Sequence, residues 1–184
     1  MDLGIKGKVA LVMASSRGLG QAMAVSLARE GVKVAVTGRS EEGLQKSVEL
    51  IQAAGGVALA LHWDLSDSSV IDGLVSKVEK ELGPIDILIN NTGGPPTTPA
   101  AGQDPALWQK SFNDMVLSLI AITDRVLPGM RQRKWGRIIT STTSGAIAPI
   151  KNLAISNTLR AALLGWSKTL AAEVAAEGIT VNVI

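Results

Sequence analysis

The sequence predicts an α/β fold in which helices cover both faces of a parallel sheet. Short runs rich in Val, Ile and Leu alternate with longer segments of helical periodicity along the chain. The short runs are apolar on both faces, as expected for strands that helices bury from both sides. A glycine repeatedly marks the return from helix to strand, because glycine adopts the left-handed conformation without strain.

Six strands are expected, and each is a short run of β-branched or aliphatic residues bounded by turn-forming residues. They cover residues 8–13, 32–37, 57–61, 85–89, 137–140 and 179–184. With 46% hydrophobic and 18% charged residues in 184, the chain can bury the core that such a sheet needs.

Capping residues set the limits of the helices between these strands. Ser40 and Asp104 are expected N-caps, and proline follows Asp104 at the first helical position. Gly31 and Gly178 are expected to end helices in the left-handed conformation. The long helix after Asp104 should bend near Pro128. The predicted helices cover residues 19–30, 41–53, 66 or 67 to 82, 105 to beyond 128, and 153–176.

Composition excludes several classes of function. The net charge is only +2 and the densest basic run is residues 131–134, so no nucleic-acid partner is expected. The longest apolar stretch, residues 115–122, is too short to cross a membrane, and residues 1–6 do not resemble a signal peptide. The chain has no cysteine, and its single histidine, His62, is not expected to bind a metal. We therefore expect a cytoplasmic protein without metal or disulfide.

The turn between the first strand and the first helix has the composition of a phosphate-binding loop. Glycines there let the backbone approach a pyrophosphate, and the helix N-terminus offers free N–H groups and a positive dipole end. This position is that of the dinucleotide-binding turn in Rossmann-type folds, which predicts a doubly wound sheet in strand order 3-2-1-4-5-6. The residues expected to bind the cofactor are Ala14, Ser15, Ser16, Arg17, Gly18, Leu19 and Gly20.

The end of the second strand indicates which dinucleotide is bound. A site for NAD(H) would place Asp or Glu there to hold the ribose 2′-hydroxyl. This chain has Arg39 instead, and no acid before Glu41. Arg39 and Arg17 provide two permanent positive charges where a 2′-phosphate would lie. We expect NADP(H) to be preferred, with NAD(H) as the alternative.

These motifs resemble those of the short-chain dehydrogenases/reductases, within them the 3-oxoacyl-(acyl-carrier-protein) reductase-like group. The resemblance extends over all 184 residues. Residues 14–20 are similar to the family's Thr-Gly-x-x-x-Gly-x-Gly turn, with Met13 for the Thr and Ala14 for the first Gly. The resemblance implies further cofactor contacts after the third and fourth strands, from Asp64, Leu65, Asn91, Thr92 and Gly93.

At the catalytic positions the sequence departs from the family. The family has a Tyr and, four residues later, a Lys on one helix, with a Ser after the fifth strand and an Asn in the preceding helix. This chain contains no tyrosine. The resemblance places the Tyr position on Ser156, the Lys position on Arg160 and the Asn position on Met115. The Ser position falls on Thr143, with Ser144 adjacent, so Thr143, Ser144, Ser156 and Arg160 are the candidate catalytic residues.

These substitutions weaken acid–base catalysis. A neighbouring ammonium can lower the pKa of a phenol from about 10 towards neutrality, whereas a deprotonated serine is far more basic. Arg160 keeps a positive charge four residues from Ser156 but cannot give up its proton. Two functions remain open. We favour an NADP(H)-dependent oxidoreductase acting on a carbonyl or alcohol over a cofactor-binding sensor or partner subunit that has lost this chemistry.

The expected organisation is a single dinucleotide-binding domain over residues 1–184. Its last strand should be central or nearly so, so we expect the chain to be cut short at its C-terminal end. The helices that begin at residues 104 and 153 are apolar around much of their circumference. The resemblance implies that such helices pair across a two-fold axis, which predicts a homodimer or homotetramer. The apolar residues concerned include Leu117, Ile120, Leu163, Leu164 and Trp166.

Overall fold

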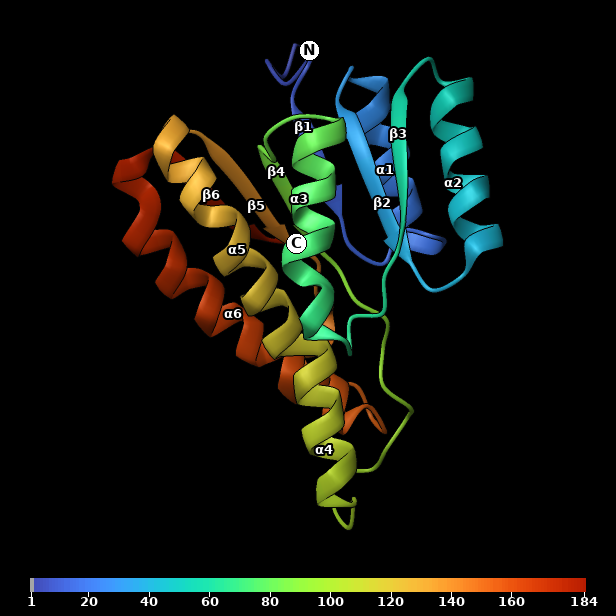
Figure 1. Cartoon of the computed structure of the whole chain (residues 1–184). Helices are drawn as coiled ribbons and strands as arrows, with labels where there is room; N and C mark the ends of the chain where they lie inside the picture. The colour runs from blue at the N-terminus through green and yellow to red at the C-terminus, as the bar shows by residue number, and fades with distance from the viewer. Residues whose placement is uncertain (1) are drawn as a thin grey trace.

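A computed structural model describes residues 2–184 and contains a six-stranded sheet in the order β3-β2-β1-β4-β5-β6 (Figure 1). All neighbouring strands are parallel, so the predicted order and orientation are confirmed. The strands are β1 Val9–Val12, β2 Lys33–Gly38, β3 Val57–His62, β4 Ile87–Asn90, β5 Gly136–Thr140 and β6 Ile179–Val183.

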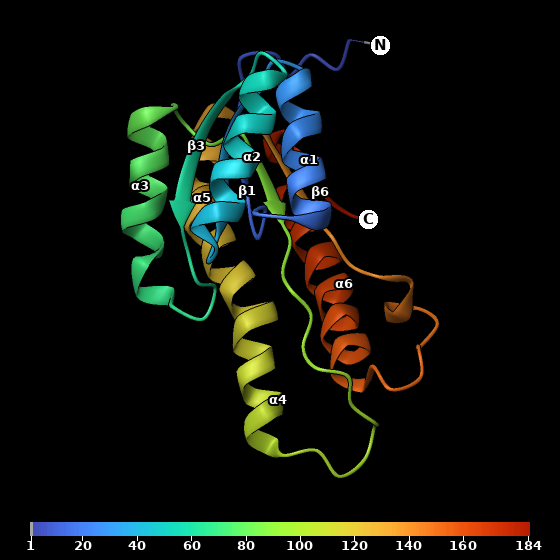
Figure 2. The same ribbon diagram turned by 90° about the vertical axis from the view of Figure 1, so that its right-hand side faces the viewer.

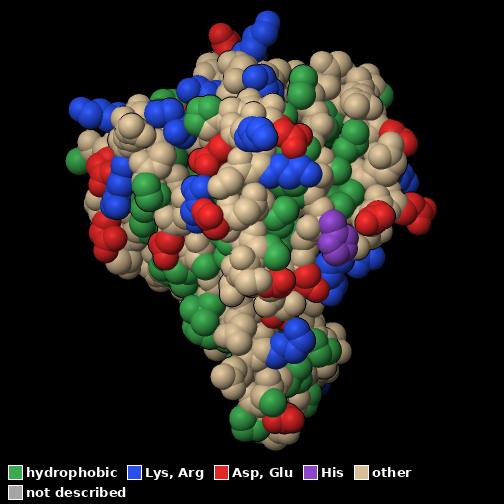
Figure 3. All heavy atoms as spheres, in the orientation of Figure 1, with side chains coloured by type: hydrophobic (Ala, Val, Ile, Leu, Met, Phe, Trp, Pro, Cys, Tyr) green, Lys and Arg blue, Asp and Glu red, His purple; other side chains and the backbone are tan. Residues whose placement is uncertain are grey.

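The helices form two layers, with α1 and α2 packed on one face of the sheet and α3, α5 and α6 on the other. Figure 2 shows β3 between α3 on one side and α1 and α2 on the other. α4 projects beyond the sheet and forms the narrow lower lobe in Figures 1 and 3. No helix within residues 2–184 is long and apolar enough to cross a membrane. The helices are α1 Gly18–Arg29, α2 Glu41–Ala53, α3 Ile71–Glu81, α4 Pro105–Phe112, α5 Ser118–Arg133 and α6 Ala154–Val174, with short 3₁₀ turns at Ser68–Val70, Ser144–Ala146 and Ala175–Glu177.

The helix limits follow the predicted capping residues. The Ser40 side chain accepts a hydrogen bond from the Gly43 N–H at 3.1 Å, and the Asp104 carboxylate accepts one from the Ala106 N–H at 2.8 Å. Gly31 and Gly178 have φ of 78° and 75°, the left-handed conformation expected where a helix gives way to a strand. These four predictions are confirmed.

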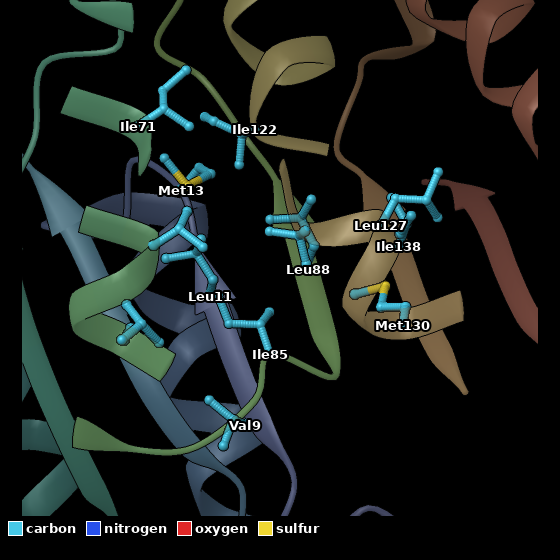
Figure 4. Close-up of a cluster of buried hydrophobic side chains, with 14 of the residues drawn as sticks. Val9, Leu11, Met13, Ile71, Ile85, Leu88, Ile122, Leu127, Met130 and Ile138 are labelled. Atoms are coloured by element: carbon cyan, nitrogen blue, oxygen red, sulfur yellow. The ribbon is translucent and has the colours of Figure 1, made fainter. Parts of the chain in front are cut away.

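Two hydrophobic layers enclose the sheet. Successive residues of β1 point to opposite faces, so Leu11 packs with α3 and α5 while Ala10 packs with α1 and α2. Figure 4 shows the first layer, in which Leu11, Leu88 and Ile138 lie across three neighbouring strands and are fully buried. Burial of each such side chain contributes about 1.5–3 kcal/mol, so these layers hold the carboxyl ends of the strands in fixed positions.

The long helical segment continues through Pro128. The sequence predicts a bend there; α5 runs on to Arg133, so Pro128 does not end the helix, and the bend itself stays a prediction. Pro128 and Asp124 are both exposed, so water can bond to the Asp124 carbonyl, which loses its helical partner. A π-helical turn that was not predicted, η2 Asn113–Leu117, separates α4 from α5. This turn packs against α6 through Met115 and Val116.

Within residues 2–184, β6 pairs only with β5. The expectation that this strand is central or nearly so stays a prediction. One expectation about the helices is wrong. Leu163 is not available for a subunit contact, because it is fully buried within the chain in a cluster with Leu119 and Ile155. Leu117, on the same helical layer, is 45% exposed.

Candidate functional site

A cavity of about 830 Å³ opens at the carboxyl edge of the sheet. Its wall is formed by the segments that follow β1, β2, β3 and β4, together with α1, α2 and α4. Ligands of doubly wound sheets bind at this edge, and the volume lies within the range of small-molecule sites. Of the residues predicted to bind a dinucleotide, only Ser15 does not line this cavity. The residues that do are Ala14, Ser16, Arg17, Gly18, Leu19, Gly20, Arg39, Asp64, Leu65, Asn91, Thr92 and Gly93.

The turn after β1 has the shape of a phosphate-binding loop. A Cβ at Gly20 would overlap the carbonyl oxygen of Ala14 and lie 2.9 Å from Ser15 Cα, so only glycine fits there. Gly18 has φ of 59°, which also favours glycine. No side chain caps the N-terminus of α1. The first N–H groups of α1 are therefore free to bind an anion beside the cavity.

Ser15 has a different position from the one predicted. Its side chain is fully buried, and its hydroxyl donates to the Val12 carbonyl at 2.7 Å and accepts from the Thr37 N–H at 2.8 Å. Both partners lie at the ends of strands, so the hydroxyl faces the sheet and not the cavity. Ser15 therefore holds the turn in place through the sheet, without lining the cavity.

Thr37 and Ser47 also hold this turn, and the sequence analysis missed both. The Thr37 hydroxyl accepts from the Ala14 N–H at 3.0 Å and donates to the Val12 carbonyl at 3.2 Å. The Ser47 hydroxyl, on α2, lies 2.9 Å from the Ser15 carbonyl. A polar residue close to the end of an otherwise apolar strand was the available signal for Thr37. Ser47 gives no such signal, because its partner comes from another βα unit.

The segment after β4 closes the floor of the cavity. The Asn91 side-chain amide donates to the carbonyls of Met13 and Ala14 at 3.3 and 3.2 Å, which ties this segment to the phosphate turn. Asn91 and Thr92 are each 8% exposed. Gly93 is exposed at the rim of the cavity. Asn91, Thr92 and Gly93 thus line the cavity, and Asn91 also supports the turn.

Two charged side chains lie on the β2–β3 side of the cavity. The Asp64 carboxylate accepts from the Ser66 N–H at 3.0 Å, and this bond is the main cause that lowers the pKa of Asp64. Arg39 also favours the ionised form, with its guanidinium 4.0 Å from the Asp64 carboxylate. Arg39 is 75% exposed, so its charge can approach a ligand without loss of a tight partner.

The four candidate catalytic residues lie outside this cavity, around the end of β5 and the start of α6. Ser156 and Arg160 are half-buried one turn apart on α6. Arg160 donates from Nη1 to the Ser141 carbonyl at 3.2 Å, and burial lowers its pKa. The Thr143 hydroxyl accepts from the Gly145 N–H at 3.3 Å, and Ser144 is exposed.

Among the residues missed, four charged side chains line the cavity. Glu42 and Lys46 lie on α2, and Lys110 and Asp114 lie on the α4 side, with the Lys110 ammonium 2.6 Å from the Asp114 carboxylate. Met115, at the family's Asn position, is 3% exposed and also lines the cavity. Lys46 lies nearly two helical turns after the Ser40 cap, so its place at the cavity depends on how α2 packs against the turn. The position of the α4 residues depends likewise on the long β4–α4 loop.

The protein-family model for short chain dehydrogenase matches residues 8–184. The chain is 34% identical over 184 residues to the 3-oxoacyl-[acyl-carrier-protein] reductase FabG of Escherichia coli, covering 99% of this chain and 73% of that protein. It is 31% identical over 180 residues to the ketoacyl reductase HetN of Nostoc sp., covering 98% of this chain and 63% of that protein. The chain thus spans less than two thirds of the length of HetN and about three quarters of that of FabG.

Solved structures share the fold closely. The L-sorbose reductase of Gluconobacter frateurii, complexed with NADPH and L-sorbose, superposes with a TM-score of 0.94 at 33% identity. The alignment covers 100% of this chain and 70% of that one. An NAD⁺-bound xylitol dehydrogenase gives a TM-score of 0.92 at 26% identity, covering 97% of this chain and 69% of that one.

Proposed function

The chain belongs to the short-chain dehydrogenase family, and from that premise we propose that it is an NADP(H)-dependent oxidoreductase that reduces a carbonyl or oxidises an alcohol. One observation carries the proposal. The residues predicted from the sequence to bind a dinucleotide come from four separate segments, and all but Ser15 line a single cavity. A structural turn alone would not require that convergence.

The residues present fit a dinucleotide. Gly20 has no room for a Cβ, and no side chain caps the N-terminus of α1. Both features suit a pyrophosphate held by backbone N–H groups. Asp64 and Leu65 would hold the adenine, and Asn91, Thr92 and Gly93 the middle of the molecule. When bound, the cofactor supplies or accepts the hydride. The chain's own contribution is to bind the cofactor, orient the substrate and stabilise the charge on its oxygen.

Arg17 and Arg39 support NADP(H) over NAD(H). Both line the cavity beside the end of β2, where a 2′-phosphate would be recognised. The similar structures include one complex with NADPH and one with NAD⁺, so NAD(H) remains the alternative cofactor.

The substrate class follows from the relatives and from the polar groups near α6. FabG and HetN are named as ketoacyl reductases, and the acetoacetyl-CoA reductase of Shinella zoogloeoides is 36% identical over 177 residues. We infer a carbonyl substrate of the 3-oxoacyl kind. The hydroxyls of Thr143, Ser144 and Ser156 are the groups that would orient its oxygen.

Proton transfer is the step for which the residues are least suited. Reduction of a carbonyl places a proton on the oxygen as well as a hydride on the carbon. Ser156 carries a hydroxyl in place of the family's phenol, and Arg160 cannot serve as an acid near neutrality. We therefore infer slow turnover with a proton drawn from water.

A second candidate function is a cofactor-binding sensor or partner subunit without reductase chemistry. The observation in its favour is the hydrogen bond from Arg160 to the Ser141 carbonyl. Through this bond Arg160, at the family's Lys position, stabilises the backbone that follows β5.

Two measurements on the same protein test the proposal. Calorimetry should detect NADPH binding that is tighter than NADH binding. NADPH oxidation, followed by absorbance against a panel of ketones and a 3-oxoacyl thioester, should then show slow turnover. Binding without turnover on any of them would favour the sensor, and failure to bind either nucleotide would refute both functions.

A further inference from the structure

Three cations from three different elements line the cofactor cavity. Arg17 lies in the turn before α1, Arg39 follows β2, and Lys46 is on α2. Within residues 2–184, no carboxylate lies within 4.0 Å of the side-chain nitrogens of Arg17 or Lys46, and Arg39 has only Asp64 at 4.0 Å. The three side chains therefore have no tight anionic partner that a bound phosphate would have to displace.

The position of Lys46 is fixed by the contact between α2 and the phosphate turn. A Cβ at Gly43, one helical turn before Lys46, would lie 2.7 Å from the Ser16 carbonyl oxygen, so the two backbones approach directly there. The next residue, Ser47, is buried and bonded to both the Ser15 carbonyl and the Gln21 side chain. The backbone of α2 at Lys46 is therefore held in place beside the turn.

Helix geometry favours a Lys46 side chain that points towards the N-terminal end of α2, which follows Arg39 in the chain. Side chains on a helix point back towards its N-terminus, which here is the end capped by Ser40 beside Arg39. Gly43 offers no side chain on that path. A lysine stem of four methylene groups can then reach the region between the turn and the end of β2.

Two carboxylates oppose these charges. Glu42 lies one turn before Lys46 on the same face of α2 and lines the cavity, and Asp64 lies across from Arg39. Three cations still outnumber two carboxylates. An added phosphate dianion would therefore meet a net positive wall, whereas an uncharged ribose hydroxyl would gain little from it.

The geometry points to Lys46 as a third member of the subsite for the 2′-phosphate, and so as a residue that sets the preference for NADP(H) over NAD(H). This inference rests on the proposed function, because it assigns a role within the same cavity. Lys46 acts on the adenosine end only, where neither hydride nor proton is transferred.

Nucleotide fragments test the assignment without any turnover. Adenosine 2′,5′-bisphosphate and 5′-AMP differ only in the 2′-phosphate, and calorimetry on the full chain gives the affinity ratio between them. Lys46→Met keeps the apolar stem and removes the charge. Lys77→Met, at an exposed position of α3 away from the cavity, is the matched control.

In Lys46→Met we expect about a fivefold loss of affinity for the bisphosphate, the scale of one exposed charge-assisted contact. Affinity for 5′-AMP should stay unchanged, and Lys77→Met should match the wild type for both. The loss should shrink at high salt, because the site is open to solvent. Thermal melts followed by circular dichroism check that each variant is folded.

The outcomes separate this inference from the proposed function. A wild type that binds both fragments equally, or neither, contradicts the NADP(H) assignment before any variant is measured. If the wild type prefers the bisphosphate and Lys46→Met has the same ratio of affinities for the two fragments, the role of Lys46 is overturned and the NADP(H) assignment stands. Equal weakening of both fragments would also overturn it, since that result indicates a general effect on the turn.

Discussion

Ala14 occupies a backbone conformation that alanine disfavours, and replacing it with glycine should stabilise the protein. Its φ is 47°, in the left-handed region. Only backbone atoms of Ala14 make its hydrogen bonds, since its N–H donates to the Thr37 hydroxyl and its carbonyl accepts from the Asn91 amide. Ala14→Gly therefore keeps every contact and removes the steric cost of the Cβ.

The magnitude follows from two opposing effects. The left-handed conformation costs alanine about 1–2 kcal/mol, and glycine removes this cost. Glycine also raises the entropy of the unfolded chain, which destabilises the folded protein by about 0.4–1 kcal/mol. The expected gain is about 0.5–1 kcal/mol, which for a chain of this size raises the Tm by about 1–4 °C.

Thermal unfolding followed by circular dichroism measures the change. Ala53→Gly is the control, because Ala53 is exposed at the end of α2 and has ordinary helical geometry. That variant should lose about 0.5–1 kcal/mol. A fall in Tm for Ala14→Gly, parallel to the control, would refute the argument from backbone conformation.

Three further predictions concern cofactor, chemistry and assembly. Arg39→Asp should narrow or reverse the preference for NADPH over NADH, because the carboxylate repels a 2′-phosphate and accepts from a ribose hydroxyl; equal wild-type affinities by calorimetry would contradict this. Ser156→Tyr with Arg160→Lys should raise the rate of NADPH oxidation with ketones more than either change alone, since a phenol needs the ammonium to lower its pKa. Robust wild-type turnover that Ser156→Ala leaves unaffected would show that the active site lies elsewhere. Exposed hydrophobic side chains on the α4–α5 segment, such as Leu117, should pair two copies of the chain. Light scattering that gives a monomer at micromolar concentration would count against this pairing.

The elements could be predicted from the sequence because local chemistry determines them. Ser40, Asp104 and Gly178 each act through atoms within a few residues, so their roles are readable from the chain alone. The strand order followed from the glycine turn in the first βα unit, which is typical of one topology. The π-helical turn at 113–117 could not be predicted in this way. No Gly or Pro marks it, and packing against α6 accompanies it.

The cavity was predicted in its residues but not in the direction of every side chain. Ser15 belongs to the predicted turn, yet its hydroxyl faces the sheet because the register of β1 against β2 brings the Thr37 N–H to it. Such a contact joins residues 22 apart and depends on strand pairing. Lys46 was missed for a similar reason, because its place at the cavity arises from the packing of α2 on the turn, where Gly43 approaches Ser16.

The cavity and the candidate catalytic residues lie on different parts of the sheet, and the departures from the family at Thr143, Ser156 and Arg160 lie in the catalytic part. Changes at Ser156 and Arg160 should therefore alter turnover while nucleotide binding persists. Arg160 already bonds to the Ser141 carbonyl at the end of β5. A lysine there has a single ammonium group in place of the five-donor guanidinium fork. If it faces a new phenol at residue 156, it leaves that carbonyl to water, so the gain in activity should be accompanied by a loss of thermal stability in the same variant.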